Sequence, residues 1–181
     1  MTENTEQLQY PKGRYQKPDD FSPEQIQGWI NVLRALPSWL DACVENMDEH
    51  QLEVPYREGG WNTKQVVHHL ADSHMNAYIR LKLALTEDNP TIKPYDEGAW
   101  ALLPDTDSVP VNVSVTLLHA LHRRWVALLE KMKPEDWLRT YHHPQSGRNI
   151  ELREMTAMYA WHSRHHTAHI TSVREKLNIG F

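Results

Sequence analysis

The sequence predicts an all-α protein, an antiparallel four-helix bundle with one long crossover connection. Four long segments repeat apolar residues at the spacing of an amphipathic helix. Between the second and third of these segments, residues 90–112 contain four prolines, which exclude a continuous helix there. The length of 181 residues suits one domain with a sizeable core, so we expect residues 1–181 to form a single domain.

The composition excludes several classes of protein. The chain has 19 Lys and Arg against 24 Asp and Glu, and the net charge of −5 argues against nucleic-acid binding, which requires a basic face. A single cysteine excludes a disulfide framework within the chain, and no apolar run approaches the length of about 18 residues that a membrane span requires. The polar first ten residues lack the apolar core of a secretory signal, so we expect a cytoplasmic protein.

The first long helix has a well-defined start. Residues 1–20 are polar and carry prolines and a glycine, so we expect an N-terminal arm without regular structure. Ser22 can then cap a helix in which Pro23 takes the first position and Gln25 completes a capping box. Pro37 interrupts the apolar repeat that follows, so this helix is expected to kink or restart just before it.

The second helix is expected over residues 62–85, because Asn62 and Gln65 form another capping box. Residues 90–112 then form the irregular crossover. This connection either covers the bundle or contributes to a pocket. The candidate pocket residues in it are Tyr95, Asp96, Glu97 and Trp100.

The remaining elements are two helices with a short hairpin between them. Apolar spacing predicts a helix over residues 114–132, which Pro134 ends. Residues 138–143 and 148–151 flank a Pro-Gln-Ser-Gly turn and suggest a hairpin. The last helix is predicted over residues 152–177.

Histidines cluster in the last helix as two pairs spaced four residues apart, and either pair could chelate one metal ion. The apolar stripe of this helix is formed by Leu152, Met155, Tyr159, Ile170 and Val173. His162 and His166 fall inside that stripe, whereas His165 should face outward and His169 lies at the edge. Two buried imidazoles need either a metal ion or hydrogen-bond partners. Because both face inward one turn apart, we favour the metal ion.

The second helix contains three more histidines, and periodicity does not select a third ligand among them. His69 and His74 flank the apolar stripe on opposite sides, and His68 points away from it. Asp72 either orients one of these imidazoles through a hydrogen bond or is a solvated acid.

Three motifs together resemble one known family. They are Gly-Trp-Asn-Thr-Lys-Gln-Val-Val-His-His-Leu-Ala-Asp-Ser-His at residues 60–74, Tyr-Asp-Glu at 95–97, and Ala-Trp-His-Ser-Arg-His-His at 160–166. The chain is similar, over nearly its whole length, to the DinB-like/YfiT superfamily. Within it, the resemblance is to the YfiT-type metal-dependent hydrolases, which include bacillithiol S-transferases. The resemblance implies a homodimer of four-helix bundles, each with one divalent metal ion on His69, His162 and His166. The family commonly continues with Arg-Gly-Gln after the last ligand, whereas this chain has Thr-Ala-His, which leaves the role of His169 open.

Three histidine ligands leave zinc, the expected metal, an open position, although nickel or another divalent ion fits the same nitrogen ligands. Such a site could activate water for attack on a small-molecule substrate, which predicts a hydrolase. Metalloproteases of the zincin type place a glutamate directly after the first histidine of their helix, whereas Ser163 stands at that position here. The catalytic base is therefore unassigned, and Asp72 is the nearest candidate in the sequence.

Two alternatives to hydrolysis stay open. The metal could stabilise the thiolate of a low-molecular-weight thiol, and the enzyme would then be an S-transferase that acts on electrophiles. Cys43 is not expected to be the nucleophile, because it continues the apolar stripe of the first helix. In the other alternative the metal is purely structural, with His74 or His169 as a fourth ligand.

Aromatic and basic side chains add two further expectations. The aromatic residues either line an apolar cavity or belong to the core. The candidates for the cavity are Trp61, Trp100, Trp125, Tyr159 and Trp161. Arg80 and Arg164 could hold an anionic group of the substrate, but we expect both to be exposed and paired with acids.

Overall fold

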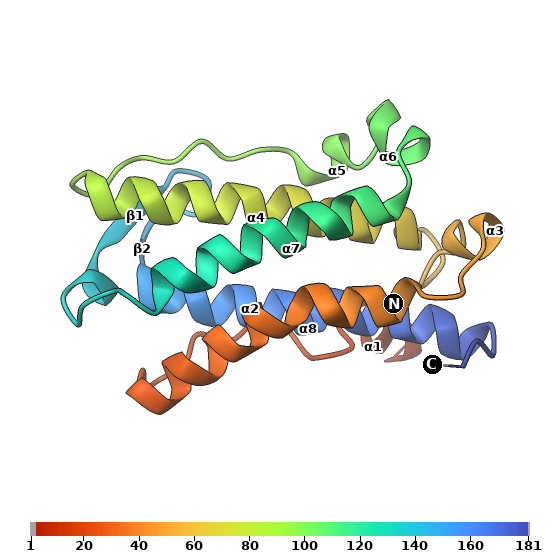
Figure 1. The fold of residues 1–181 in the computed structure, drawn as a ribbon, viewed down its shortest axis with the longest axis horizontal. Helices are drawn as coiled ribbons and strands as arrows, with labels where there is room; N and C mark the ends of the chain where they lie inside the picture. Colours follow the sequence, from red (N-terminus) through yellow and green to blue (C-terminus); the bar gives the residue numbers. More distant parts are fainter. Residues whose placement is uncertain (1–2, 181) are drawn as a thin grey trace.

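A computed structural model describes residues 3–180, and its main body is a bundle of four long helices (Figure 1). These helices are α2 (Pro23–Val44), α4 (Thr63–Thr86), α7 (Val111–Leu129) and α8 (Leu152–Lys176). Helix α2 packs against α7 and α8, and α4 packs against the same two helices. The predicted all-α four-helix bundle is confirmed, and α2 and α4 lie on one diagonal of it.

The predicted long crossover determines the direction of the helices. After α4 the chain runs back along the bundle before α7 begins, so α7 runs parallel to α4, and α8 then runs antiparallel to both (Figure 1). The order is therefore up, down, down, up. The crossover is not wholly irregular, because it includes two short helices, α5 (Glu97–Trp100) and α6 (Pro104–Ser108).

The N-terminal arm contains a helix, α1 (Glu3–Gln9), so the expectation of no regular structure over residues 1–20 is wrong. The arm lies against α8, where the ring centroids of Tyr10 and His165 are 6.0 Å apart and those of Tyr15 and Trp161 are 5.8 Å apart. Contacts with a distant helix thus stabilise a segment whose own sequence gives only a weak helical signal.

The smaller elements follow the sequence closely. Strands β1 (Thr140–His143) and β2 (Arg148–Glu151) pair as the predicted antiparallel hairpin. Gly147 in the connecting turn has φ 65°, a conformation that glycine adopts without strain. Two further short helices are α3 (Glu49–Leu52) and η1 (Asp136–Leu138).

Both predicted capping boxes are present, from Ser22 with Gln25 and from Asn62 with Gln65. Pro37 lies inside a single uninterrupted α2, so the helix does not restart there. Because proline has no amide hydrogen, the carbonyl of Leu33, four residues earlier, is left without its usual partner in the helix.

The apolar core forms two clusters with a layer of histidines between them. One cluster is centred on Trp125, Leu81 and Met155, and the other on Leu36, Leu70 and Ile170. Along α8 the histidine segment lies between the residues of the two clusters, and on α4 His74 lies between them, whereas His69 lies directly beside Leu70 of the second cluster. Within residues 3–180, no helix is long and apolar enough to cross a membrane.

Candidate metal centre

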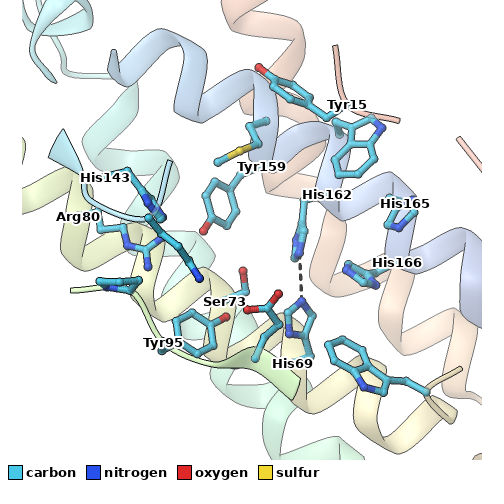
Figure 2. Close-up of a pocket in the computed structure, with 16 residues that line it drawn as sticks. Tyr15, His69, Ser73, Arg80, Tyr95, His143, Tyr159, His162, His165 and His166 are labelled. Atoms are coloured by element: carbon cyan, nitrogen blue, oxygen red, sulfur yellow. Dashed lines mark hydrogen bonds between the residues drawn. The ribbon is translucent and has the colours of Figure 1, made fainter. Parts of the chain in front are cut away.

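His69 of α4 and His162 and His166 of α8 lie together in the histidine layer (Figure 2). One nitrogen of each ring lies within 4.8 Å of the others, and Nε2 of His69 is 3.2 Å from Nε2 of His162. Zn–N bonds of 2.0–2.1 Å place two nitrogens of a tetrahedral site about 3.4 Å apart. The three side chains therefore fit one small divalent cation without a large rearrangement.

A chain of hydrogen bonds determines which nitrogen of His162 is free. The Leu33 carbonyl can only accept, so Nδ1 of His122 donates to it at 2.5 Å. Nε2 of His122 then accepts from Nδ1 of His74 at 2.9 Å. Nε2 of His74 in turn accepts from Nδ1 of His162 at 3.2 Å. This tautomer leaves a lone pair on Nε2 of His162, the atom that faces His69.

A second, shorter chain acts on His166. Nε2 of His169 donates to the carbonyl of Gln9 at 3.2 Å, so its Nδ1 is an acceptor. Nδ1 of His166 lies 3.3 Å from that acceptor and donates to it. His166 therefore also keeps an unprotonated Nε2, and both histidines of α8 are prepared to act as ligands through the same atom.

Burial keeps these rings neutral, which is the form that binds metals. Desolvation lowers the pKa of His162 and of His166 well below its usual value, and neighbouring histidines lower both further. Burial likewise lowers the pKa of His69 to about 4. The three candidate ligands are therefore unprotonated at neutral pH.

The prediction that His165 faces solvent is wrong, because only 6% of the residue is exposed. Its ring stacks on Trp161 at 4.6 Å between centroids, and the N-terminal arm covers it. His165, His166 and His169 form a second group whose nitrogens could hold a metal ion. In that group both nitrogens of His169 are engaged in hydrogen bonds, so the first group is the better candidate.

His68 was expected to point away from the apolar stripe of its helix, yet it is buried as well. The residue is 8% exposed, and its ring nitrogens bond to Ser114 Oγ at 2.7 Å and to the Val109 carbonyl at 3.1 Å. His68 thus fastens α4 to α7 and to Val109, the residue directly after α6. It does not contact the candidate metal site.

The three histidines line a cavity of about 450 Å³. Tyr95 and Glu97 of the crossover line it, as predicted for a pocket, whereas Asp96 and Trp100 do not. The other lining residues are Tyr15, Trp61, Ser73, Arg80, Pro94, His143, Gln145, Met158, Tyr159, Trp161 and His165. Trp125 belongs instead to the buried core.

Two carboxylates, Asp72 and Glu97, are candidates for the catalytic base. Asp72 does not line the cavity, although burial and the nearby Asp105 raise its pKa to about 6. Glu97 does line the cavity, as expected for a candidate pocket residue of the crossover. The sequence did not single it out as a base, because no motif places a glutamate beside the histidines.

Two more side chains test expectations from the sequence. Cys43 is 3% exposed and lies 3.8 Å from Thr171 Oγ, and burial raises its pKa, so the expected core thiol is confirmed. Arg80 was expected on the surface but is only 8% exposed and lines the cavity, whereas Arg164 is exposed.

Comparisons with known proteins agree with this architecture. The sequence profile of the DinB superfamily matches residues 32–170. A "Putative metal-dependent hydrolase" from Bacillus mycoides strain KBAB4 is 52% identical over 94% of this chain and 98% of its own length. A protein of the same name from Bacillus cereus strain 03BB102 is 51% identical over the same shares.

Two solved structures share this fold. YfiT from Bacillus subtilis, described as a probable metal-dependent hydrolase with an unusual four-helix bundle topology, is 46% identical, with a TM-score of 0.93 over 96% of this chain and 99% of its own. A mycothiol-dependent maleylpyruvate isomerase is 15% identical, with a TM-score of 0.63 over 80% of this chain and 60% of its own. This second similarity concerns the fold alone.

Proposed function

This chain belongs to the DinB superfamily, and from that premise and the histidine cluster we propose that it is a metal-dependent hydrolase of a small molecule. His69, His162 and His166 hold one divalent cation, with zinc the expected metal, although nickel or another divalent ion suits the same nitrogen ligands and availability decides which one is bound. The observation that carries this proposal is the 3.2 Å approach of two Nε2 atoms in a cluster that lines a cavity.

A divalent cation in this position supplies a positive charge that lowers the pKa of a water molecule or a thiol and so makes a nucleophile available at neutral pH. The protein contributes the surrounding cavity, in which Trp61 and Trp161 form apolar walls beside the histidines. A volume of about 450 Å³ suits a small molecule rather than a polypeptide.

Glu97 is the residue that we assign to proton transfer. It lines the same cavity as the three histidines, and an ionised carboxylate can accept a proton from an attacking water. Asp72, the candidate from the sequence, lies outside the cavity lining. Glu97 lies in the first turn of α5, a short helix of the crossover that packs against α4, the helix that carries His69.

A specific observation supports thiol transfer as a second candidate. Among residues 3–180, no carboxylate forms a hydrogen bond or ion pair with His69, His162 or His166. Three neutral imidazoles leave the full charge of the cation available to an anionic thiolate. A thiol has a pKa of about 8.5, so its activation depends less on a general base than that of water.

Activity assays separate the two candidates. We expect the metal-loaded protein to cleave activated esters or amides without added thiol, and to lose this activity with a chelator. Glu97→Gln should lower kcat by about 100-fold or more, the usual contribution of a general base. If turnover instead requires a small thiol and an electrophile such as a chlorinated aromatic, the S-transferase replaces the hydrolase.

Metal content tests the ligand set directly. His162→Ala should lower the metal stoichiometry of the purified protein, whereas His50→Ala, which removes an exposed histidine from α3, should leave it unchanged. Elemental analysis measures both. Equal metal content in the two variants would remove His162 from the site.

A further inference from the structure

Arg80 is a buried cation in the wall of the same cavity. The residue is 8% exposed, and its Nε atom is buried without a hydrogen-bond partner. In the described part of the chain, Arg80 forms no ion pair with an aspartate or glutamate. Long basic side chains are rarely buried unless they are paired, so this arrangement calls for an explanation.

Arg80 and His69 belong to one face of α4. They are separated by 11 residues, which is close to three full helical turns, or about 16 Å along the axis. Ser73, four residues after His69, lies on the same face and also lines the cavity. Figure 2 shows Arg80 with His143 at one end of the pocket, while the three candidate ligands lie toward the other.

Neighbouring side chains leave the guanidinium without a negative partner. The neutral Tyr159 hydroxyl lies near both Arg80 and Ser73, and their side chains partly offset the rise that burial causes in its pKa. Glu154, a buried acid of α8, is already paired with Arg148 at 2.8 Å and Lys17 at 3.0 Å. Nδ1 of His143, in the same wall, is a second buried nitrogen without a partner.

A guanidinium presents several N–H donors in a planar fork that matches a carboxylate or a phosphate group. We propose that the Arg80 end of the cavity binds an anionic group of the substrate, a carboxylate or a phosphate, and so determines substrate specificity. The inference rests on the proposed function, in that the same molecule reacts near His69. The anionic group is held by Arg80, and the reacting part extends along the shared face of α4 toward the histidines.

The test compares benzoate, phenyl phosphate and the neutral benzamide as probes, with dissociation constants measured by calorimetry on the metal-loaded protein. Charge-assisted hydrogen bonds predict that at least one anion binds roughly tenfold or more tightly than benzamide. The preferred anion distinguishes a carboxylate from a phosphate as the group that the site accepts. If neither anion binds more tightly than benzamide, the proposal is wrong.

Variants assign the preference to Arg80. Arg80→Gln should abolish it, whereas Arg164→Gln, which removes an exposed arginine of α8, should preserve it. Should Arg80→Gln fail to fold by circular dichroism, Arg80→Lys serves instead. That variant keeps the charge without the planar fork and should retain only part of the preference. A preference unchanged by substitution of Arg80 would mean that the anion binds elsewhere, for example at the metal.

Repeating the titrations on chelated protein separates this inference from the proposed function. The preference that depends on Arg80 should persist without metal, because Arg80 is three turns away from His69. If the protein proves to hold no metal but still shows the preference, the proposed function fails and the anion site remains. Loss of the preference on chelation would show that the metal, not Arg80, provides it.

Discussion

Pro37 has no amide hydrogen, and the Leu33 carbonyl that this leaves free accepts a hydrogen bond from His122. From there the hydrogen bonds continue through His74 to His162. A residue that looks from the sequence like a simple helix interruption thus influences which nitrogen of His162 carries a lone pair. The orientation of one ligand is determined on α2, which contributes no ligand itself.

This chain of hydrogen bonds predicts an effect of a residue that does not line the cavity. His122→Leu removes the fixed acceptor for His74, so His162 loses its preferred tautomer. We expect zinc affinity to fall about 10- to 100-fold, the usual result of removing an outer partner of a histidine ligand. Competition with a chromophoric chelator measures the affinity.

Two comparisons distinguish this role from general destabilisation. His119→Leu removes a neighbouring histidine of α7 whose Nε2 donates a hydrogen bond to Asp41 at the surface, and should leave zinc affinity unchanged. His122→Gln should restore much of the affinity, because an amide can donate to Leu33 and accept from His74. Nitrogen-15 NMR of His162 should report one tautomer in the wild type and a mixture in His122→Leu; a single unchanged tautomer would contradict the argument.

At the level of whole helices, capping determines how well the site is held. Asn62 caps α4, which carries His69 in its second turn, and Ser22 caps α2, which carries no candidate ligand. We expect Asn62→Ala and Ser22→Ala each to lower the free energy of unfolding by about 1 kcal/mol. Urea denaturation of the metal-free proteins measures this.

Only the cap of α4 should affect metal binding. Fraying of its first turn loosens His69, so Asn62→Ala should also weaken zinc affinity, whereas Ser22→Ala should not. Equal zinc affinity in the two variants would show that the position of His69 depends on packing alone.

The helices were predictable because their signals are local. Capping boxes, apolar spacing and the hairpin turn all lie within a few residues of the features that they determine. The helical periodicity of α8 also placed His162 and His166, but not His165, inside the apolar stripe of that helix. The same argument failed for His165, because it assumes that a helix has one covered face, whereas the N-terminal arm covers a second face of α8.

Side chains whose environment comes from distant segments were not predictable. Residues of the hairpin and of α8 line the cavity around Arg80, and no local pattern in α4 predicts that they bury it. The crossover made Glu97 a candidate for a pocket, but its place in one cavity with the histidines depends on the return of the crossover along the bundle, which no local pattern predicts. Choosing His69 over His74 required a resemblance to known proteins, since both flank the apolar stripe. In the structure, His74 is the hydrogen-bond partner of a candidate ligand.

Across the whole molecule, the two apolar clusters lie on either side of the histidine layer, and each joins several helices. Most of the stabilising burial therefore does not involve the metal. This arrangement argues against a purely structural metal, for which folding would depend on the ion. It also leaves a set of buried neutral histidines whose protonation opposes folding.

The metal-free protein should consequently be folded at neutral pH and sensitive to acid. Burial lowers the pKa of His69 and of His122 to about 4, against 6.5 in the unfolded chain. Between these pH values the unfolded state binds more protons than the folded state. The contribution of the two histidines to the free energy of unfolding is therefore fully present above pH 6.5 and is lost as the pH falls toward 4. Each such histidine should lower the free energy of unfolding by about 1 kcal/mol at pH 5.5.

Urea denaturation of chelated protein at pH 7.5 and 5.5 measures the loss, and circular dichroism at pH 7.5 should still show the helices. If chelation at pH 7.5 abolished the helical signal, the metal would be structural; if stability did not change with pH, the histidines would not be buried in their neutral form.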